Sequence, residues 1–154
     1  MTALNEIYNS RILELAANIP ALQRLASPDA TATAHSKLCG STITVDIKLD
    51  GERVVEFGQV VKACLLGQAS ASIVARNVVG ATVAEVREVA AIMRAMLKEN
   101  GPPPGGRWKD LAILEPVRDY KARHASTMLV FEAIERAFDQ IAERNDSIEP
   151  AATA

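Results

Sequence analysis

The chain has 154 residues, of which 49% are hydrophobic and 23% charged, and its net charge is −2. This length and composition predict one globular domain with a sizeable core. The near-neutral charge gives no basic surplus for nucleic acid or an anionic membrane. No apolar run approaches the roughly 20 residues of a membrane span, and residues 1–10 lack the features of a secretory signal. We therefore expect a cytoplasmic protein whose two cysteines are metal, redox or structural thiols.

The first predicted element is an amphipathic helix of about four turns that ends near Pro20. Its apolar residues recur at steps of three and four, which puts them on one face: Leu4, Ile7, Tyr8, Ile12, Leu15 and Ile19. We expect this helix to cover the core. A loop follows at residues 27–29, Ser-Pro-Asp.

A three-stranded antiparallel meander is predicted between residues 31 and 62. Residues 41–49 alternate between polar and apolar, the period of a strand with one wet and one dry face. Asp50-Gly51 is a favoured two-residue hairpin turn, and residues 53–62 form the returning strand. Residues 31–36 are weakly strand-like and complete the sheet, with residues 37–40 as the turn into the second strand.

The predicted hairpin brings both cysteines to one end of the sheet. Cys39 precedes the first hairpin strand and Cys64 follows the second. Cys64 also precedes a predicted helix over residues 66–79 that closes at Gly80. The unpaired N–H groups and partial positive charge of a helix N-terminus favour a thiolate, the form that binds metal or accepts sulfur. The alternative is that both cysteines are ordinary buried residues.

A long helix and a short helix are predicted next. Thr82 and Glu85 fit a capping box that opens the long helix. A proline- and glycine-rich loop over residues 102–106 follows it and has no phosphate-binding pattern. The short helix covers residues 107–114, with Trp108 packed inward.

The last long helix is predicted over residues 122–144, followed by a disordered tail over residues 145–154. Its apolar residues form one buried stripe, made of Met128, Phe131, Ile134, Phe138 and Ile141. His124 lies one turn before Met128 and is therefore expected to face the body of the protein. The other histidine, His35, lies near the cysteine end, where we expect an exposed residue at a sheet edge.

The order of these features resembles the scaffold proteins for iron–sulfur cluster assembly, of the IscU, SufU and NifU N-terminal type, over about residues 4–142. The landmarks are an N-terminal helix with Tyr8, Cys39-Gly40 before the hairpin, Cys64 at the start of a helix rich in serine and alanine, and Arg123-His124-Ala125-Ser126 at the last helix. The loop at 102–106 is similar to the insertion of the SufU branch. The resemblance implies an α+β fold in which a three-stranded antiparallel sheet packs against four to five helices, as one domain over residues 1–144.

The resemblance also implies a site for a metal ion or a nascent cluster. In the family three cysteines and an aspartate surround this site, whereas this chain offers Cys39, Cys64 and His124 as metal ligands. Three positions depart from the family pattern: Ser41 replaces the aspartate, Ala125 the third cysteine, and Ala63 the glycine before the second cysteine. Ser41 and His35 are candidate auxiliary ligands. We expect a transient iron–sulfur cluster, or zinc, to be held less tightly than by the full set.

The resemblance and the three departures from it imply three candidate functions. The first is a scaffold or carrier that accepts sulfur from a cysteine desulfurase, accepts iron, and passes a cluster to apoproteins. The second is a degenerate scaffold homologue that binds and regulates the desulfurase. The third is a zinc-dependent sulfur-transfer module with Cys64 as its nucleophile. No catalytic triad, P-loop or dinucleotide fingerprint is visible, so we do not expect an enzyme.

A basic cluster precedes the last helix and consists of Arg118, Lys121 and Arg123. Such clusters are usually solvated connections. Within the resemblance, these residues are the candidate docking segment for a desulfurase or a chaperone, because exposed charged loops commonly carry binding.

Overall fold

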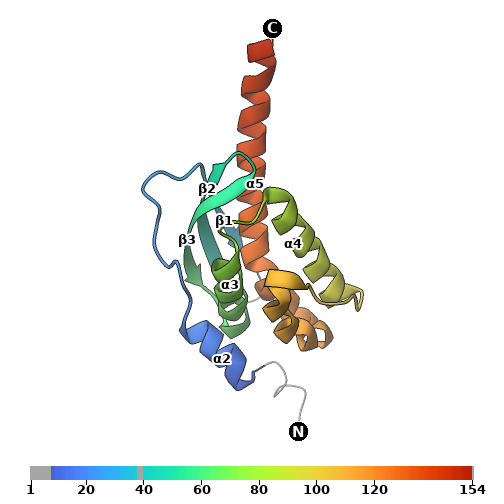
Figure 1. Cartoon of the computed structure of the whole chain (residues 1–154). Coiled ribbons are helices and arrows are strands. Elements are labelled where there is room, and N and C mark those ends of the chain that lie inside the picture. Colours follow the sequence, from blue (N-terminus) through green and yellow to red (C-terminus); the bar gives the residue numbers. More distant parts are fainter. Residues whose placement is uncertain (1–7, 38–39, 154) are drawn as a thin grey trace.

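The computed structural model describes residues 8–37 and 40–153, with side chains described through Asp146. Its centre is a three-stranded antiparallel sheet in the order β1(Ala30–His35), β2(Thr42–Asp50) and β3(Arg53–Lys62). Helix α5(His124–Thr153) packs along β1 and β2, and α3(Leu65–Asn77) packs beside it and against β3 (Figure 1). Helices therefore cover one face of the sheet, which confirms the predicted α+β fold.

The β2–β3 hairpin has the predicted strands and a turn displaced by one residue. Asp50 pairs with Arg53, so the two turn residues are Gly51 and Glu52 rather than Asp50 and Gly51. Gly51 has a φ of +63°, whereas the second turn residue, Glu52, has no positive φ. A glycine at the first turn position is the pattern of a type II′ turn, whereas the predicted type needs positive φ at both positions.

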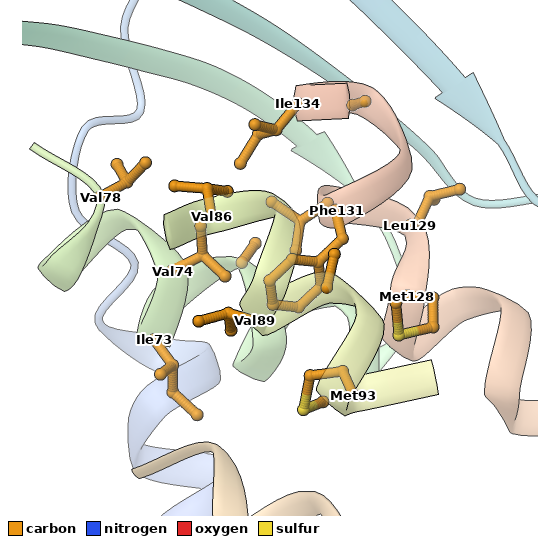
Figure 2. Packing of buried hydrophobic residues seen from close by; sticks show 14 of the residues in the cluster. Ile73, Val74, Val78, Val86, Val89, Met93, Met128, Leu129, Phe131 and Ile134 are labelled. Atoms are coloured by element: carbon orange, nitrogen blue, oxygen red, sulfur yellow. The ribbon is translucent and has the colours of Figure 1, made fainter. Parts of the chain in front are cut away.

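The inner face of the sheet supplies the floor of the core. Ile43, Val45 and Ile47 of β2 are fully buried, as expected from their alternation with polar residues. The apolar stripe predicted for the last helix is buried as well: Met128, Phe131, Ile134, Phe138 and Ile141. Figure 2 shows the Phe131 ring among side chains of α3 and α4. The same contacts thus join the long helix to both neighbouring helices.

The other face is partly covered by the chain between α2 and β1. Gly58 lies under this segment, and a Cβ atom there would stand 2.2 Å from the backbone oxygen of Gln23. The next residue, Gln59, donates its N–H to the carbonyl oxygen of Ala21 at 2.9 Å. A glycine in β3 therefore permits the segment to lie directly on the edge strand.

Asp46 anchors the same segment from the middle of β2. Its side chain is buried and accepts hydrogen bonds from Arg24 Nε at 2.7 Å, the Leu25 N–H at 3.0 Å and Thr31 Oγ1 at 2.5 Å. Burial by itself would raise the pKa of this carboxyl group, but these hydrogen bonds and the charge of Arg24 together lower the pKa below its usual value.

The first described helix, α2(Ser10–Ala17), begins later than predicted. Asn9 caps it by accepting a hydrogen bond from the Ile12 N–H at 2.9 Å, and Tyr8 lies before this cap. The cap sets the start because its side chain satisfies an N–H group that has no partner within the helix. The predicted apolar positions Leu4 and Ile7 lie outside the described residues.

Helix α4(Val83–Lys98) begins at the predicted cap. Thr82 Oγ1 accepts a hydrogen bond from the Glu85 N–H at 3.1 Å. The Glu85 carboxylate accepts a 2.7 Å hydrogen bond from the Trp108 indole. This bond ties α4 to the 3₁₀ helix η1(Gly106–Asp119), which is longer than the short helix predicted at residues 107–114.

The last described element is one long helix. The short 3₁₀ helix η2(Lys121–Arg123) leads into α5, which runs to Thr153 where we expected a helix end at Arg144 and then a disordered tail. Extending an existing helix avoids the cost of a new nucleus. Figure 1 shows this C-terminal part extending beyond the sheet. No described helix is both long and apolar enough to cross a membrane.

Candidate functional site

The start of β2 and the end of β3 form the cysteine end of the sheet. Thr42 pairs with Lys62 there, and Cys64 follows two residues later as the N-cap of α3. Its side chain is half-buried and makes no capping hydrogen bond. Cys64 thus stands at a helix N-terminus, as the sequence predicts.

Cys39 lies outside the described residues, but both flanks of its turn are described. The Ser36 N–H donates to the carbonyl oxygen of Ser41, and the Gly40 N–H donates to that of Ser36, each at 2.9 Å. Ser41 in turn contacts Cys64, whose N–H donates to Ser41 Oγ at 3.3 Å. The segment that contains Cys39 is therefore followed directly by a residue that contacts Cys64, the N-cap of α3.

Ser41 has a defined structural task at this position. It is buried, with 4% exposure, and its hydroxyl oxygen accepts the N–H of Cys64 at the start of α3. Backbone N–H groups at the start of a helix lack partners within the helix. Ser41 thus supports the helix end that presents the cysteine, and its role as an auxiliary ligand stays a prediction.

His124 is the first residue of α5 and faces the body of the protein, as predicted, with 8% exposure. Its Nε2 lies 3.1 Å from the carbonyl oxygen of Val117 and 3.0 Å from that of Arg118. Carbonyl oxygens only accept hydrogen bonds, so Nε2 carries a proton. In the neutral ring, Nδ1 is then the nitrogen whose lone pair can bind a metal ion.

The first turns of α3 and α5 pack against each other. A Cβ atom at Gly67 would stand 2.8 Å from the Ala63 Cβ and 3.2 Å from the Ser126 carbonyl oxygen. Cys64 therefore belongs to the helix end that adjoins the turn carrying His124 and Ala125. The helix ends that carry Cys64 and His124, far apart in sequence, are therefore neighbours.

The described residues alone do not supply a full set of ligands for a metal ion. Over residues 8–37 and 40–153, no group of three histidine, cysteine, aspartate or glutamate side chains gathers in a metal-binding arrangement. The donors in this region are the Cys64 thiol, the Ser41 hydroxyl and the His124 imidazole. Thiolate and imidazole suit zinc and iron, and the set reaches three such ligands only with Cys39.

The remaining predicted residues lie around this region. His35 is exposed on the edge strand β1 and pairs with Thr42. Lys121 and Arg123 are exposed, whereas Arg118 is half-buried and donates to the Gly101 carbonyl oxygen at 3.0 Å. Arg118 also forms an ion pair with Glu115 at 3.1 Å. The free charge of the predicted docking segment is therefore carried by Lys121 and Arg123 rather than by Arg118.

A cavity of about 810 Å³ lies beside His124, between the end of α4 and the start of α5. Its lining includes Arg118, Lys121, His124 and Ala125 but not Cys64. Sequence reasoning did not identify this cavity, because its walls come from four separate elements, α4, η1, η2 and α5. The amphipathic pattern of each element gives no sign of the gap between them.

Comparison with protein families matches residues 7–127 to the NifU-like N terminal domain. A solved structure of the N-terminal part of a nitrogen-fixing NifU-like protein from Brucella abortus is 56% identical, with a TM-score of 0.91, over 92% of this chain and 99% of that chain. A comparison with curated proteins finds no match.

A more distant structure is named as an iron–sulfur cluster assembly scaffold protein for the SUF system, from Fervidobacterium islandicum AW-1. It is 18% identical, with a TM-score of 0.79, over 86% of this chain and 97% of that chain, so it supports the fold alone. The family match and the Brucella abortus structure together show that this chain belongs to the NifU-like N-terminal domain family.

Proposed function

We propose that this protein is a scaffold or carrier for iron–sulfur cluster assembly, which accepts sulfur and iron as cargo and passes on a cluster or sulfur. The observation that carries this proposal is the position of Cys64. Cys64 is the N-cap residue of α3 and its thiol is half-buried, at a helix end whose backbone N–H groups favour negative charge. The helix end that bears His124 packs against the same turn.

The proposed ligands are Cys39, Cys64 and His124, with Ser41 and His35 as auxiliary donors. Two thiolates and an imidazole suit iron and zinc. The family aspartate and third cysteine are absent, so at least one coordination position is left to sulfide, water or a residue of a partner. An open position weakens retention of the cargo and favours its transfer.

The proposed partners are a cysteine desulfurase as sulfur donor and apoproteins or a chaperone as recipients. Lys121 and Arg123 are exposed next to the first turn of α5, and Arg118 supports this segment from inside. Exposed cations steer association with an acidic surface. We place this exchange in the cytoplasm and assign the protein a binding role rather than an enzymatic one.

A second candidate function is that of a regulator that binds the desulfurase without building a cluster. Ser41 favours it, because its hydroxyl is already engaged by the Cys64 N–H and Ala125 supplies no thiolate. A third is zinc-dependent sulfur transfer, in which Cys64 alone carries the sulfur. It predicts that Cys64→Ser abolishes sulfur uptake and Cys39→Ser does not.

Anaerobic reconstitution with ferrous iron and sulfide, read by visible absorbance and by iron and sulfide analysis, tests the scaffold function. We expect the wild type to gain a cluster and Cys64→Ser to lose it, while the control Ser10→Ala, on the exposed side of α2, behaves as wild type. If the wild type takes up neither iron nor zinc while it still binds a desulfurase, the regulator is correct and the scaffold function is wrong.

A further inference from the structure

We infer that His124 is also a positioning residue, whose Nε2–H holds the segment between η1 and α5 in place. The imidazole is buried, and its Nε2 lies within hydrogen-bond distance of two carbonyl oxygens, those of Val117 at 3.1 Å and Arg118 at 3.0 Å. A side chain at the first residue of α5 thus binds the last turn of η1. This contact closes the intervening residues 119–123, which hold the end of η1, Tyr120 and the 3₁₀ helix η2.

The carbonyl groups at this junction need such a partner. The last carbonyl oxygens of a helix find no N–H donor within the helix. Val117 and Arg118 lie in the last turn of η1, which ends at Asp119. The Val117 oxygen also accepts a hydrogen bond from the Tyr120 N–H at 2.9 Å. The His124 Nε2–H therefore lies between one carbonyl oxygen that has another donor, that of Val117, and the carbonyl oxygen of Arg118. Without His124, the part-buried carbonyl oxygen of Arg118 loses this donor, while that of Val117 keeps the Tyr120 N–H, so the contact with Arg118 is the one whose loss loosens the junction.

The loop that this contact closes carries the proposed docking residues. Lys121 and Arg123 lie in η2 and are exposed, and Arg118 and Lys121 line the cavity beside His124. On the other side of the junction, Thr127 Oγ1 donates to the Arg123 carbonyl oxygen at 2.9 Å. The segment is therefore fixed from within α5 at both of its ends.

The two ring nitrogens of His124 then connect metal binding to the docking segment, an inference that rests on the proposed function. A histidine that binds a metal through one ring nitrogen generally donates the other N–H to a carbonyl or carboxylate, which fixes the orientation of the ring. Here Nε2 already makes that contact, so an ion bound at Nδ1 holds the ring and, through it, residues 117–119. Loading the site thereby orders the surface that a partner meets.

Two substitutions separate these roles. His124→Gln keeps an N–H donor at the reach of Nε2 but lacks the imidazole lone pair, whereas His124→Ala removes both. Hydrogen–deuterium exchange of the amides in residues 117–123, measured on the metal-free full chain, reports the positioning role. We expect His124→Ala to speed exchange at least about fivefold and His124→Gln to stay near wild type. Equal exchange in all three proteins overturns the inference, and a urea titration identifies any global loss of stability.

Zinc ion is the probe for the connection between metal binding and the order of residues 117–123. We expect zinc to slow exchange in residues 117–123 of the wild type, and to leave His124→Gln and Cys64→Ser unchanged. Zinc that binds the wild type at one equivalent but leaves these amides unchanged overturns the link alone. Absence of zinc and iron binding by the wild type refutes the proposed function and the link, while the metal-free comparison of Ala and Gln still decides the positioning role.

Discussion

The buried carboxylate of Asp46 is held by the guanidinium group of Arg24, with Oδ2 and Nε 2.7 Å apart. The two residues are 22 positions apart in the chain. One lies in β2 and the other in the irregular segment before β1, so the contact fastens a long loop to the middle of the sheet. Its consequence can be measured as a dependence of stability on pH.

Asp46→Asn is expected to destabilise the fold by about 1–3 kcal/mol, because the amide replaces a charged acceptor of several hydrogen bonds in a buried position. The pKa of Asp46 is lowered in the folded state. Its contribution to stability is therefore present above the unfolded pKa of about 3.9 and is lost as the pH falls through the folded pKa. Urea unfolding at a series of pH values measures both effects.

In this series, the difference in unfolding free energy between wild type and Asp46→Asn is expected to be constant near neutral pH and to shrink below about pH 4. Asp139→Asn is the matched control, since Asp139 pairs with Arg87 at the surface and such pairs contribute little. A difference that grows toward acid pH contradicts the lowered pKa.

Gly58→Ala is expected to destabilise the protein by roughly 1–3 kcal/mol through overpacking. The added methyl group would stand 2.2 Å from the backbone oxygen of Gln23, and a backbone atom cannot move aside without displacing the loop. Thermal or urea unfolding measures the loss. Gly105→Ala is the control, because a Cβ atom there meets nothing within 4 Å; equal effects of both changes would show that the loop yields freely.

Gly67→Ala tests the packing of α3 on α5. The new Cβ atom would crowd the Ala63 Cβ at 2.8 Å and the Ser126 carbonyl oxygen at 3.2 Å, so the two helix ends must move apart. Because Cys64 and His124 belong to these ends, we expect zinc affinity to fall about tenfold, which corresponds to about 1.4 kcal/mol. Isothermal titration with zinc measures it. Unchanged affinity would mean that the metal ligands do not span the contact.

Ser41→Ala removes the hydroxyl that accepts the Cys64 N–H at 3.3 Å. We expect a loss of about 1 kcal/mol in unfolding free energy, the usual effect of removing a side-chain acceptor at a helix start. Urea unfolding checks this value, with Ser10→Ala on the exposed side of α2 as control. If zinc affinity falls while stability is unchanged, Ser41 is a ligand rather than a support for α3.

Local patterns in the sequence predicted most elements of this fold. The alternation at residues 41–49 corresponds to β2, and the cap at Thr82 starts α4. Element ends were less exact: the turn lies at Gly51-Glu52, α2 begins only at Ser10, and α5 continues past Arg144. These ends depend on single hydrogen bonds and on helix propagation, which residue periodicity does not encode.

The sequence by itself determined which residues alternate, cap helices and turn the chain, and these features were enough to bring Cys64 to a helix start at the end of the sheet. Only the tertiary structure decided that the His124 Nε2 is occupied by two carbonyl oxygens, that Asp46 meets Arg24, and that Gly58 must lack a side chain. Local patterns depend on the conformational preferences of neighbouring residues. The contacts of His124, Asp46 and Gly58 join separate segments of the chain, and they exist only once the sheet and helices have packed together.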